Sequence, residues 1–362
     1  MVIMVMFRRR TFLVQAVAAI ATVLMLKACT SPQAPSEPTS AEATSTSNSA
    51  TVRFTLDWAV QGVHAPIGVA IEKGYFAEEG VDVAFEPGTG SADAITKVAS
   101  GAFDMGFGDI NSLMEFNVNN PETPVRAVAI YYNQSPMAVM TLDESGITDP
   151  KQLEGKKLGI PAGSATRRLL PLFAQTVGFD EAQVELPAIE SKLQQTLLLT
   201  KEIDAIAPFT ISALPNLKEA GYPPERLNIF RFTDYGLDLY GNAVIVSASY
   251  LENNPEAVRG FLRALARGLQ DTLSNPDEAI DIMAEFDDLF EKDLERERLQ
   301  IAIDTLFLSP EVTQNGWGAV DPQRFERTID LVVSGFGLAR TPAANEIFDA
   351  QYLPDAAERS LP

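Results

Sequence analysis

Residues 51–83 constrain the fold most, because they combine the patterns of a strand, a helix and a second strand. Residues 52–58 alternate apolar and polar side chains, as a strand with one buried face does. Pro66 suits the first turn of a following helix through Tyr75, and residues 81–85 alternate again. A strand–helix–strand unit is the building block of a parallel sheet, so we expect an α/β fold.

The same unit recurs along the chain. Ser91 is expected to cap a second helix, and residues 103–107 predict a third strand. Residues 158–160, 203–207 and 243–247 predict three further strands, with helical segments between the first two. The chain therefore contains enough strands and helices to form more than one α/β lobe.

A long helix is predicted over residues 255–274, with Asn254 as its cap. Its apolar residues recur with helical spacing and predict a stripe packed on a core: Val258, Phe261, Leu262, Leu265 and Leu269. Residues 100–106 and 200–206 share a hydrophobic pattern and an aspartate, which suggests two similar lobes. We expect residues 277–362 to form further helices that cover the first lobe.

Residues 1–28 have the charge order of an export signal. Three consecutive arginines, at residues 8–10, precede an apolar run over residues 12–26 that is short for a membrane span. Residues 9–13 match the twin-arginine pattern R-R-x-F-L. An ordinary Sec signal is the alternative, and the sequence leaves both export routes open.

Cys29 is the only cysteine in the chain and ends a segment that resembles a bacterial lipobox, LKAC. We expect lipid attachment there, although Lys27 departs from the pattern, and cleavage after Ala28 without lipidation is the alternative. Residues 29–50 are rich in Ser, Thr, Pro and Ala, and such segments bury too little apolar surface to become ordered. We expect a disordered linker that tethers a periplasmic or surface-exposed domain to the cytoplasmic membrane by a lipid alone.

The charge of the chain argues against two kinds of partner, nucleic acid and anionic lipid. Without residues 1–28 it has 24 basic and 49 acidic residues, a net charge of −25. Such a surface does not suit the phosphates of nucleic acid or broad contact with anionic lipid. With 46% hydrophobic residues, the roughly 310 residues beyond the linker can form two cores.

Several candidate ligand contacts follow expected strands. Asp57 and Trp58 end the first strand, where the indole could stack on a flat heterocycle, although strand alternation also allows Trp58 a place in the core. His64 is the only histidine, and it either contacts a ligand or orients the next helix. A lone histidine makes neither a catalytic dyad nor a zinc site.

Four polar side chains stand at expected helix starts: Ser91, Asp109, Ser164 and Thr166. The free N–H groups there attract an acceptor group of a ligand, although capping the helix is the commoner use. Arg167 and Arg168 follow, and either could pair with a carboxylate or sulfonate or lie on a solvated face.

Four more candidates belong to the second lobe or its hinge: Phe209, Asp238, Tyr240 and Asn242. Their acceptor, amide and ring groups suit a heterocycle, and hinge packing is the alternative for Tyr240.

Three segments carry a family resemblance. They are LDWAVQGVHAPIGVAIEKGYFAEEGVDV, GSADAITKVASGAFDMGFGD and DPKQLEGKKLGIPAGSATRRLLP. They resemble the substrate-binding proteins of the nitrate/sulfonate/taurine ABC transporter group, in the NMT1/THI5-like (SsuA/THI5-like) branch. The resemblance covers roughly residues 52–275 and is specific for the family rather than for the ligand.

The resemblance implies a type II periplasmic binding protein fold. Two α/β lobes with doubly wound parallel sheets would be joined by two crossing strands, near residues 136–141 and 241–246. Lobe 1 would comprise residues 51–138 and 243–362, and lobe 2 residues 139–242. A ligand would bind between them, where open parallel sheets place their crevice.

The resemblance also implies a monomeric solute-binding lipoprotein that serves the permease of an ABC importer. A thiamine-pyrimidine precursor is the favoured ligand, and a small anion such as a sulfonate, taurine or nitrate is the alternative. A scaffold without a ligand is disfavoured by the glycine-rich strand ends.

One relative, the fungal thiamine-pyrimidine synthase, uses a pyridoxal-phosphate lysine, a histidine that is consumed and a cysteine-rich iron motif. Its lysine and histidine positions fall here on Gly108 and Ser112, and no cysteine lies near residues 240–242. We therefore expect no enzyme activity, no cofactor and no metal.

Overall fold

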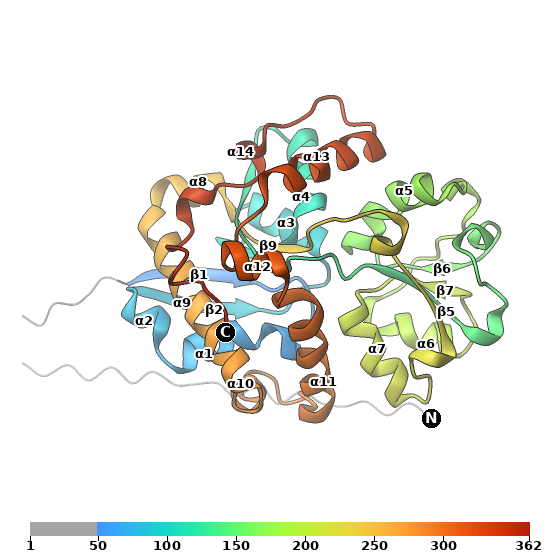
Figure 1. Cartoon of the computed structure of the whole chain (residues 1–362), viewed down its shortest axis with the longest axis horizontal. Coiled ribbons are helices and arrows are strands. Elements are labelled where there is room, and N and C mark those ends of the chain that lie inside the picture. Colours follow the sequence, from blue (N-terminus) through green and yellow to red (C-terminus); the bar gives the residue numbers. More distant parts are fainter. Residues whose placement is uncertain (1–48) are drawn as a thin grey trace, which may run out of the picture. The chain divides into compact units, whose positions relative to one another are not determined.

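Two mixed sheets organise residues 49–362, the part of the chain that the computed structural model describes (Figure 1). The predicted signal peptide, Cys29 and the linker up to residue 48 lie outside the described residues. Ala50, which was expected to end the linker, is instead the first residue of a strand and pairs with Val81. We call the five-stranded sheet with its helices lobe 1 and the four-stranded sheet with its helices lobe 2.

The sheet of lobe 1 has the order β2-β1-β3-β9-β4. Its strands are β1 (Ala50–Thr55), β2 (Val81–Glu86), β3 (Met105–Asp109), β4 (Val125–Ile130) and β9 (Asn242–Ser247). β1 runs parallel to β2 and β3, and β9 runs antiparallel to both of its neighbours. In β1, Val52 and Phe54 are buried while Arg53 pairs with Asp104 on the outer side, which explains the alternation in the sequence.

The sheet of lobe 2 has the order β6-β7-β5-β8. Its strands are β5 (Ala138–Leu142), β6 (Leu158–Gly159), β7 (Ala205–Ile206) and β8 (Leu227–Arg231). β6 and β7 are parallel, and β5 runs antiparallel to β7 and β8. In each sheet the antiparallel strand is the one that the chain enters from the other lobe.

Helices cover both sheets (Figure 1). Those of lobe 1 are α1 (Ala65–Glu72), α2 (Tyr75–Glu78), α3 (Ser91–Ala99), α4 (Ile110–Asn119), α8 (Ala248–Asn253), α9 (Pro255–Ser274), α10 (Pro276–Met283), α11 (Lys292–Ala302), α12 (Pro310–Asn315), α13 (Pro322–Phe336) and α14 (Ala344–Ile347). Those of lobe 2 are α5 (Ala165–Val177), α6 (Gln194–Leu199) and α7 (Thr210–Glu219). The bounds predicted for α9 are confirmed, and its apolar stripe is fully buried. Asn254 occupies its N-cap position, but the expected side-chain cap bond is not formed.

Two segments connect the lobes, residues 131–137 and residues 232–241. The crossings predicted at residues 136–141 and 241–246 fall mainly on β5 and β9, the strands that follow these segments. Strand pairing assigns Ala138 to the sheet of lobe 2 and Asn242 to that of lobe 1, so each predicted lobe boundary differs by one residue.

The C-terminal region extends beyond the lobe that it was expected to cover. α10 packs on α1 and α9 of lobe 1, but α13 contacts both α4 of lobe 1 and α5 of lobe 2. At Gly335 on α13 an added Cβ would lie 2.3 Å from Leu172 Cδ1, which allows α13 and α5 to approach closely. The last helices therefore hold part of lobe 2 as well.

Candidate functional site

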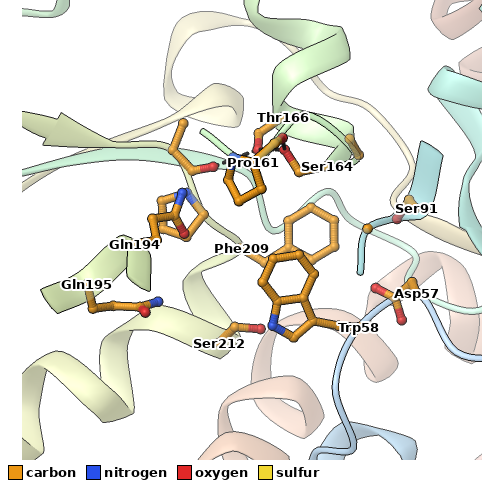
Figure 2. A pocket seen from close by; sticks show the side chains of 14 residues that line it. Asp57, Trp58, Ser91, Pro161, Ser164, Thr166, Gln194, Gln195, Phe209 and Ser212 are labelled. Carbon is orange, nitrogen blue, oxygen red and sulfur yellow. Dashed lines mark hydrogen bonds between the residues drawn. The ribbon is translucent and has the colours of Figure 1, made fainter. Parts of the chain in front are cut away.

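A pocket lies between the lobes and encloses about 430 Å³ of empty space, part of it open to solvent (Figure 2). Lobe 1 contributes Asp57, Trp58, Gly90 and Ser91. Lobe 2 contributes Pro161, Ser164, Ala165, Thr166, Gln194, Gln195, Ala207, Pro208, Phe209 and Ser212. The wall is formed by loops that follow strands and by the first turns of helices, where α/β sheets commonly bind ligands.

Asp57 is held at the pocket by the only histidine of the chain. The carboxylate is buried, and its Oδ1 atom lies 3.1 Å from Nε2 of the fully buried His64. The backbone N–H of Gln61 donates to Nδ1 of His64 at 3.2 Å, so Nδ1 carries no proton. The imidazole is therefore neutral and donates from Nε2 to Asp57. His64 orients a pocket residue rather than lining the pocket itself.

Two aromatic rings line the pocket from opposite lobes (Figure 2). Trp58 is half-buried in the loop after β1, and its carbonyl accepts from the backbone N–H of Gly88 at 2.9 Å. An added Cβ at Gly88 would lie 2.1 Å from the carbonyl oxygen of Leu56, so this loop contact needs glycine. Phe209 is the N-cap residue of α7. The fixed loop keeps the indole at the pocket instead of in the core.

The hydroxyl groups from α5 lie at the start of the helix, as expected. Ser164 is the N-cap residue and accepts from the backbone N–H of Arg167 at 3.3 Å. Its own proton is donated to the carbonyl of Pro161 at 2.8 Å, and Thr166 donates to the carbonyl of Ala207 at 2.6 Å. These bonds tie the first turn of α5 to the ends of β6 and β7.

Comparison with models of known protein families shows to which family the chain belongs. The NMT1/THI5-like family model matches residues 61–279. The chain belongs to the NMT1/THI5-like family. This finding confirms the resemblance seen in the sequence.

Similar proteins in this family include both binding proteins and synthases. The chain is 27% identical to the formylaminopyrimidine-binding protein of Halalkalibacterium halodurans, over 83% of this chain and 90% of the relative. It is 27% identical to the riboflavin-binding protein RibY of Chloroflexus aurantiacus, over 92% and 95% of the two chains. A 4-amino-5-hydroxymethyl-2-methylpyrimidine phosphate synthase of Saccharomyces cerevisiae, THI11, is 26% identical over 69% and 75%.

Solved structures share the fold. The aliphatic sulphonate binding protein SsuA from Escherichia coli superposes with a TM-score of 0.61 at 13% identity, covering 82% of this chain and 91% of that one. The nitrate-binding protein NrtA from Synechocystis PCC 6803 has a TM-score of 0.58 at 13% identity, covering 86% and 89%. These likenesses confirm the two-lobed periplasmic binding protein fold.

Behind the pocket of this NMT1/THI5-like protein lies a buried polar group of side chains. Ser91 is the first residue of α3 with Gly90 at its N-cap position, so Ser91 does not cap the helix as expected; its hydroxyl donates to Asn242 Oδ1 at 3.3 Å. Asp109 is fully buried and caps α4 by accepting from the N–H of Ser112 at 2.7 Å. Desolvation raises the pKa of Asp109 to about 6. Asp109 and Asn242 do not line the pocket.

Three further expected contact residues lie away from the pocket, which corrects the site that the sequence predicted. Tyr240 donates to Glu311 Oε1 at 2.6 Å, and the guanidinium of Arg324 covers its ring at 4.1 Å. The mostly exposed Asp238 pairs with the same Arg324 at 2.9 Å. Both residues belong to a connecting segment that α12 and α13 hold against lobe 1. Arg167 lies on α5 outside the pocket wall.

Sequence reasoning missed the contributions of Gln194, Gln195 and Ser212. Gln194 is buried and donates to the carbonyl of Gly159 at 2.9 Å, which fixes its amide beside the pocket. Ser212 donates to Gln61 Oε1 of lobe 1 at 2.9 Å. Two neighbouring glutamines at the start of a short helix were the only available signal, because residues 181–193 have no regular apolar period.

Gly108 and Ser112, where the resemblance places the reactive lysine and histidine of the synthase, both lie in packed surroundings. An added Cβ at Gly108 would lie 2.9 Å from Ile245 Cδ1 and 3.0 Å from Ile95 Cγ1. Ser112 is buried on α4. Among residues 49–362, no three His, Cys, Asp or Glu side chains are grouped so that they could hold a metal ion. The helices of the same residues include none with the length and apolar character of a membrane span.

Proposed function

We propose that this protein is the solute-binding component of an ABC importer and captures a planar heterocyclic solute between its lobes, outside the cytoplasmic membrane. The observation that carries the proposal is the pair of aromatic side chains, Trp58 and Phe209, which reach one pocket from opposite lobes. Closure of two lobes over a flat ring would bring an aromatic face from each lobe to the ligand. A thiamine-pyrimidine precursor is the ligand that we favour.

The relatives support a heterocycle in two ways. The names of two similar binding proteins specify a formylaminopyrimidine and riboflavin, which are both planar ring systems. The synthases of the same family also act in the chemistry of a methylpyrimidine. A small anion such as a sulfonate or nitrate is the second candidate, because it is named for neighbours that share only the fold.

We propose a binding protein rather than an enzyme. Gly108 supports this assignment, because a glycine stands where the resemblance places the reactive lysine of the synthase. The pocket itself presents hydroxyl, amide, carboxylate and aromatic groups, with no cysteine, histidine or lysine among its described residues. Such a set can hold a solute but offers no strong nucleophile.

We propose that the protein is exported and anchored by a lipid. The signal-like residues 1–28 and Cys29 support export and a lipid anchor, with residues 29–50 as the tether to the domain. The protein would act as a monomer and present its closed, ligand-bound form to the permease. Incorporation of radiolabelled palmitate tests the lipid anchor. We expect the protein to be labelled and the variant Cys29→Ala not to be.

A thermal-shift screen of the full-length chain in detergent tests the ligand class. We expect 4-amino-5-hydroxymethyl-2-methylpyrimidine or a close aminopyrimidine to raise the melting temperature, and taurine, ethanesulfonate and nitrate to leave it unchanged. A shift with the anions alone would contradict the proposal. Mass spectrometry of the bound compound after prolonged incubation should recover it unaltered, and steady conversion would indicate an enzyme instead.

A further inference from the structure

The hydroxyl groups on the pocket wall have all given their protons to the protein. Ser164 donates to the carbonyl of Pro161, and Thr166 to that of Ala207. Ser212 donates to Gln61 Oε1 at 2.9 Å, and Ser91 to Asn242 Oδ1 at 3.3 Å. A hydroxyl has one proton and two lone pairs. Toward a ligand, these four groups can therefore act only as hydrogen-bond acceptors.

Asp57 adds a negative charge to this wall. Its carboxylate accepts one hydrogen bond among the described residues, from the neutral His64, so no cation balances it. Among residues 49–362, the pocket wall contains no lysine or arginine. The side-chain donors that remain are the indole N–H of Trp58, one N–H of the Gln194 amide and the amide of Gln195. The first turn of α5 adds the backbone N–H groups of Ala165 and Thr166. Among the polar side chains of the wall, acceptors and negative charge therefore dominate.

A ligand must match this polarity. An anion would bring a second negative charge toward the partly desolvated carboxylate, where charge repulsion is weakly screened. A ligand without N–H or O–H groups would leave the acceptors without partners when the lobes close and exclude water, and buried groups without partners are costly. A flat ring with amino groups would satisfy the acceptors while its faces contact the aromatic side chains.

We propose that the pocket selects its ligand by N–H donors, and that Asp57 is the specificity-determining residue. The class of ligand is a neutral or cationic planar heterocycle with an exocyclic amino group or a ring N–H directed at Asp57. This inference rests on the proposed function and sharpens it. It predicts that small anions bind this pocket more weakly than such a heterocycle does.

Three pyrimidine probes separate these possibilities by isothermal titration of the full-length protein. The first is 4-amino-2-methylpyrimidine, and the second is its 4-dimethylamino analogue, which keeps the ring but has no N–H group. The third is 2-methylpyrimidine-4-carboxylate, which replaces the donor by an anion. We expect the dimethylamino probe to bind at least tenfold more weakly than the amino probe, and the carboxylate probe not to bind measurably.

The variant Asp57→Asn tests the specificity-determining residue. The amide can still accept from Nε2 of His64 through its oxygen, while its NH₂ group would replace the outward acceptor by a donor. We expect the amino probe to lose at least tenfold in affinity and the carboxylate probe to gain measurable binding. Asp82→Asn is the matched control, because Asp82 is exposed on β2 and the substitution removes the same charge away from the pocket. Its affinities should equal those of the unsubstituted protein.

The outcomes distinguish the inference from the function on which it rests. If no heterocycle binds the unsubstituted protein, the proposed function fails, and the inference with it. If the amino and dimethylamino probes bind equally well, or if the carboxylate binds best, the heterocycle function stands and the donor-selection inference is overturned. The probe series uses the unsubstituted protein, so a misfolded Asp57→Asn variant does not remove the test.

Discussion

The backbone N–H of Ala92 donates to the carbonyl of Gly163 at 3.1 Å, and this bond joins α3 of lobe 1 to the loop before α5 of lobe 2. The bond lies beside the pocket, because Gly90, two residues before Ala92, and Ser164, which follows Gly163, both line the pocket. Gly90 has φ of +152°, and an added Cβ would lie 2.0 Å from the carbonyl oxygen of Gly163. The two lobes therefore meet backbone to backbone at this edge of the site.

Gly90→Ala should prevent this approach and lower ligand affinity. A methyl group cannot occupy the 2.0 Å gap, and the backbone at this residue has a conformation that favours glycine. We expect at least tenfold weaker binding of 4-amino-5-hydroxymethyl-2-methylpyrimidine in isothermal titration. Gly163→Ala is the control, because its nearest contact would be 3.4 Å, to Asp93 Cβ, and its affinity should change less than threefold. Unchanged affinity in Gly90→Ala would show that this close contact is not needed for binding.

Trp58→Ala should weaken ligand binding while the fold stays largely intact. The indole is half-buried at the pocket, and loss of an aromatic contact to a ring should cost about tenfold in affinity. The chain has two tryptophans, so intrinsic fluorescence can assign the signal. The fluorescence change on ligand addition should disappear in Trp58→Phe and persist in Trp317→Phe, whose ring is buried away from the pocket. Unchanged affinity in Trp58→Ala would place the indole outside the binding site.

Arg298→Ala should destabilise the protein strongly. Arg298 is buried on α11, where it pairs with the buried Glu295 and bonds to Asn216 on α7 of lobe 2. Glu295 accepts from the backbone N–H of Gly62 at 2.6 Å. Removing the guanidinium leaves a buried carboxylate without its charge partner, which costs about 3–5 kcal/mol in the free energy of unfolding. Urea denaturation measures this loss.

The variant Asn216→Ala distinguishes an effect on closure of the lobes from an effect on folding stability at the bond between Arg298 and Asn216. The substitution removes an acceptor of Arg298 that belongs to lobe 2, while the Arg298–Glu295 pair within lobe 1 remains. We therefore expect weaker ligand binding with a loss of only about 1 kcal/mol in unfolding free energy. A large loss of stability with unchanged affinity would mean that the contact supports the fold rather than the closed arrangement of the lobes.

Asp109 should make stability fall as the pH rises from about 4 to 6. Desolvation raises the pKa of this buried carboxyl from 3.8 to about 6 in the folded protein. The folded state then binds a proton more tightly than the unfolded state, so its contribution is complete below pH 3.8 and is lost as the pH passes 6. The shift corresponds to a loss of about 3 kcal/mol.

Asp109→Asn should flatten that pH dependence. Asparagine also caps helices well, so it can accept from the N–H of Ser112 without becoming charged. We expect the variant to be more stable than the unsubstituted protein at pH 7 and similar to it at pH 4, as measured by urea denaturation across this range. An identical pH profile in both proteins would assign the effect to other carboxyl groups.

Some of the site was accessible from local sequence. Asp57, Trp58, Ser164 and Phe209 each follow an expected strand, and all four line the pocket. This worked because strand and helix periods show where an element ends, and parallel strands present those ends at one edge. Asp238 and Tyr240 were assigned to the second lobe or its hinge, and Arg324 and Glu311 hold them in the connecting segment, away from the pocket.

The α/β class, the bounds of α9 and the family could be predicted without the structure, because periodicity, caps and motifs act over short stretches of chain. The packing of the two lobes was needed to learn that Gly90 meets Gly163, that Ser212 bonds to Gln61, and that the pocket hydroxyls have already donated their protons. Those contacts join segments that are 73 or 151 residues apart. They depend on how two lobes pack, and neither segment carries a local pattern that specifies its partner.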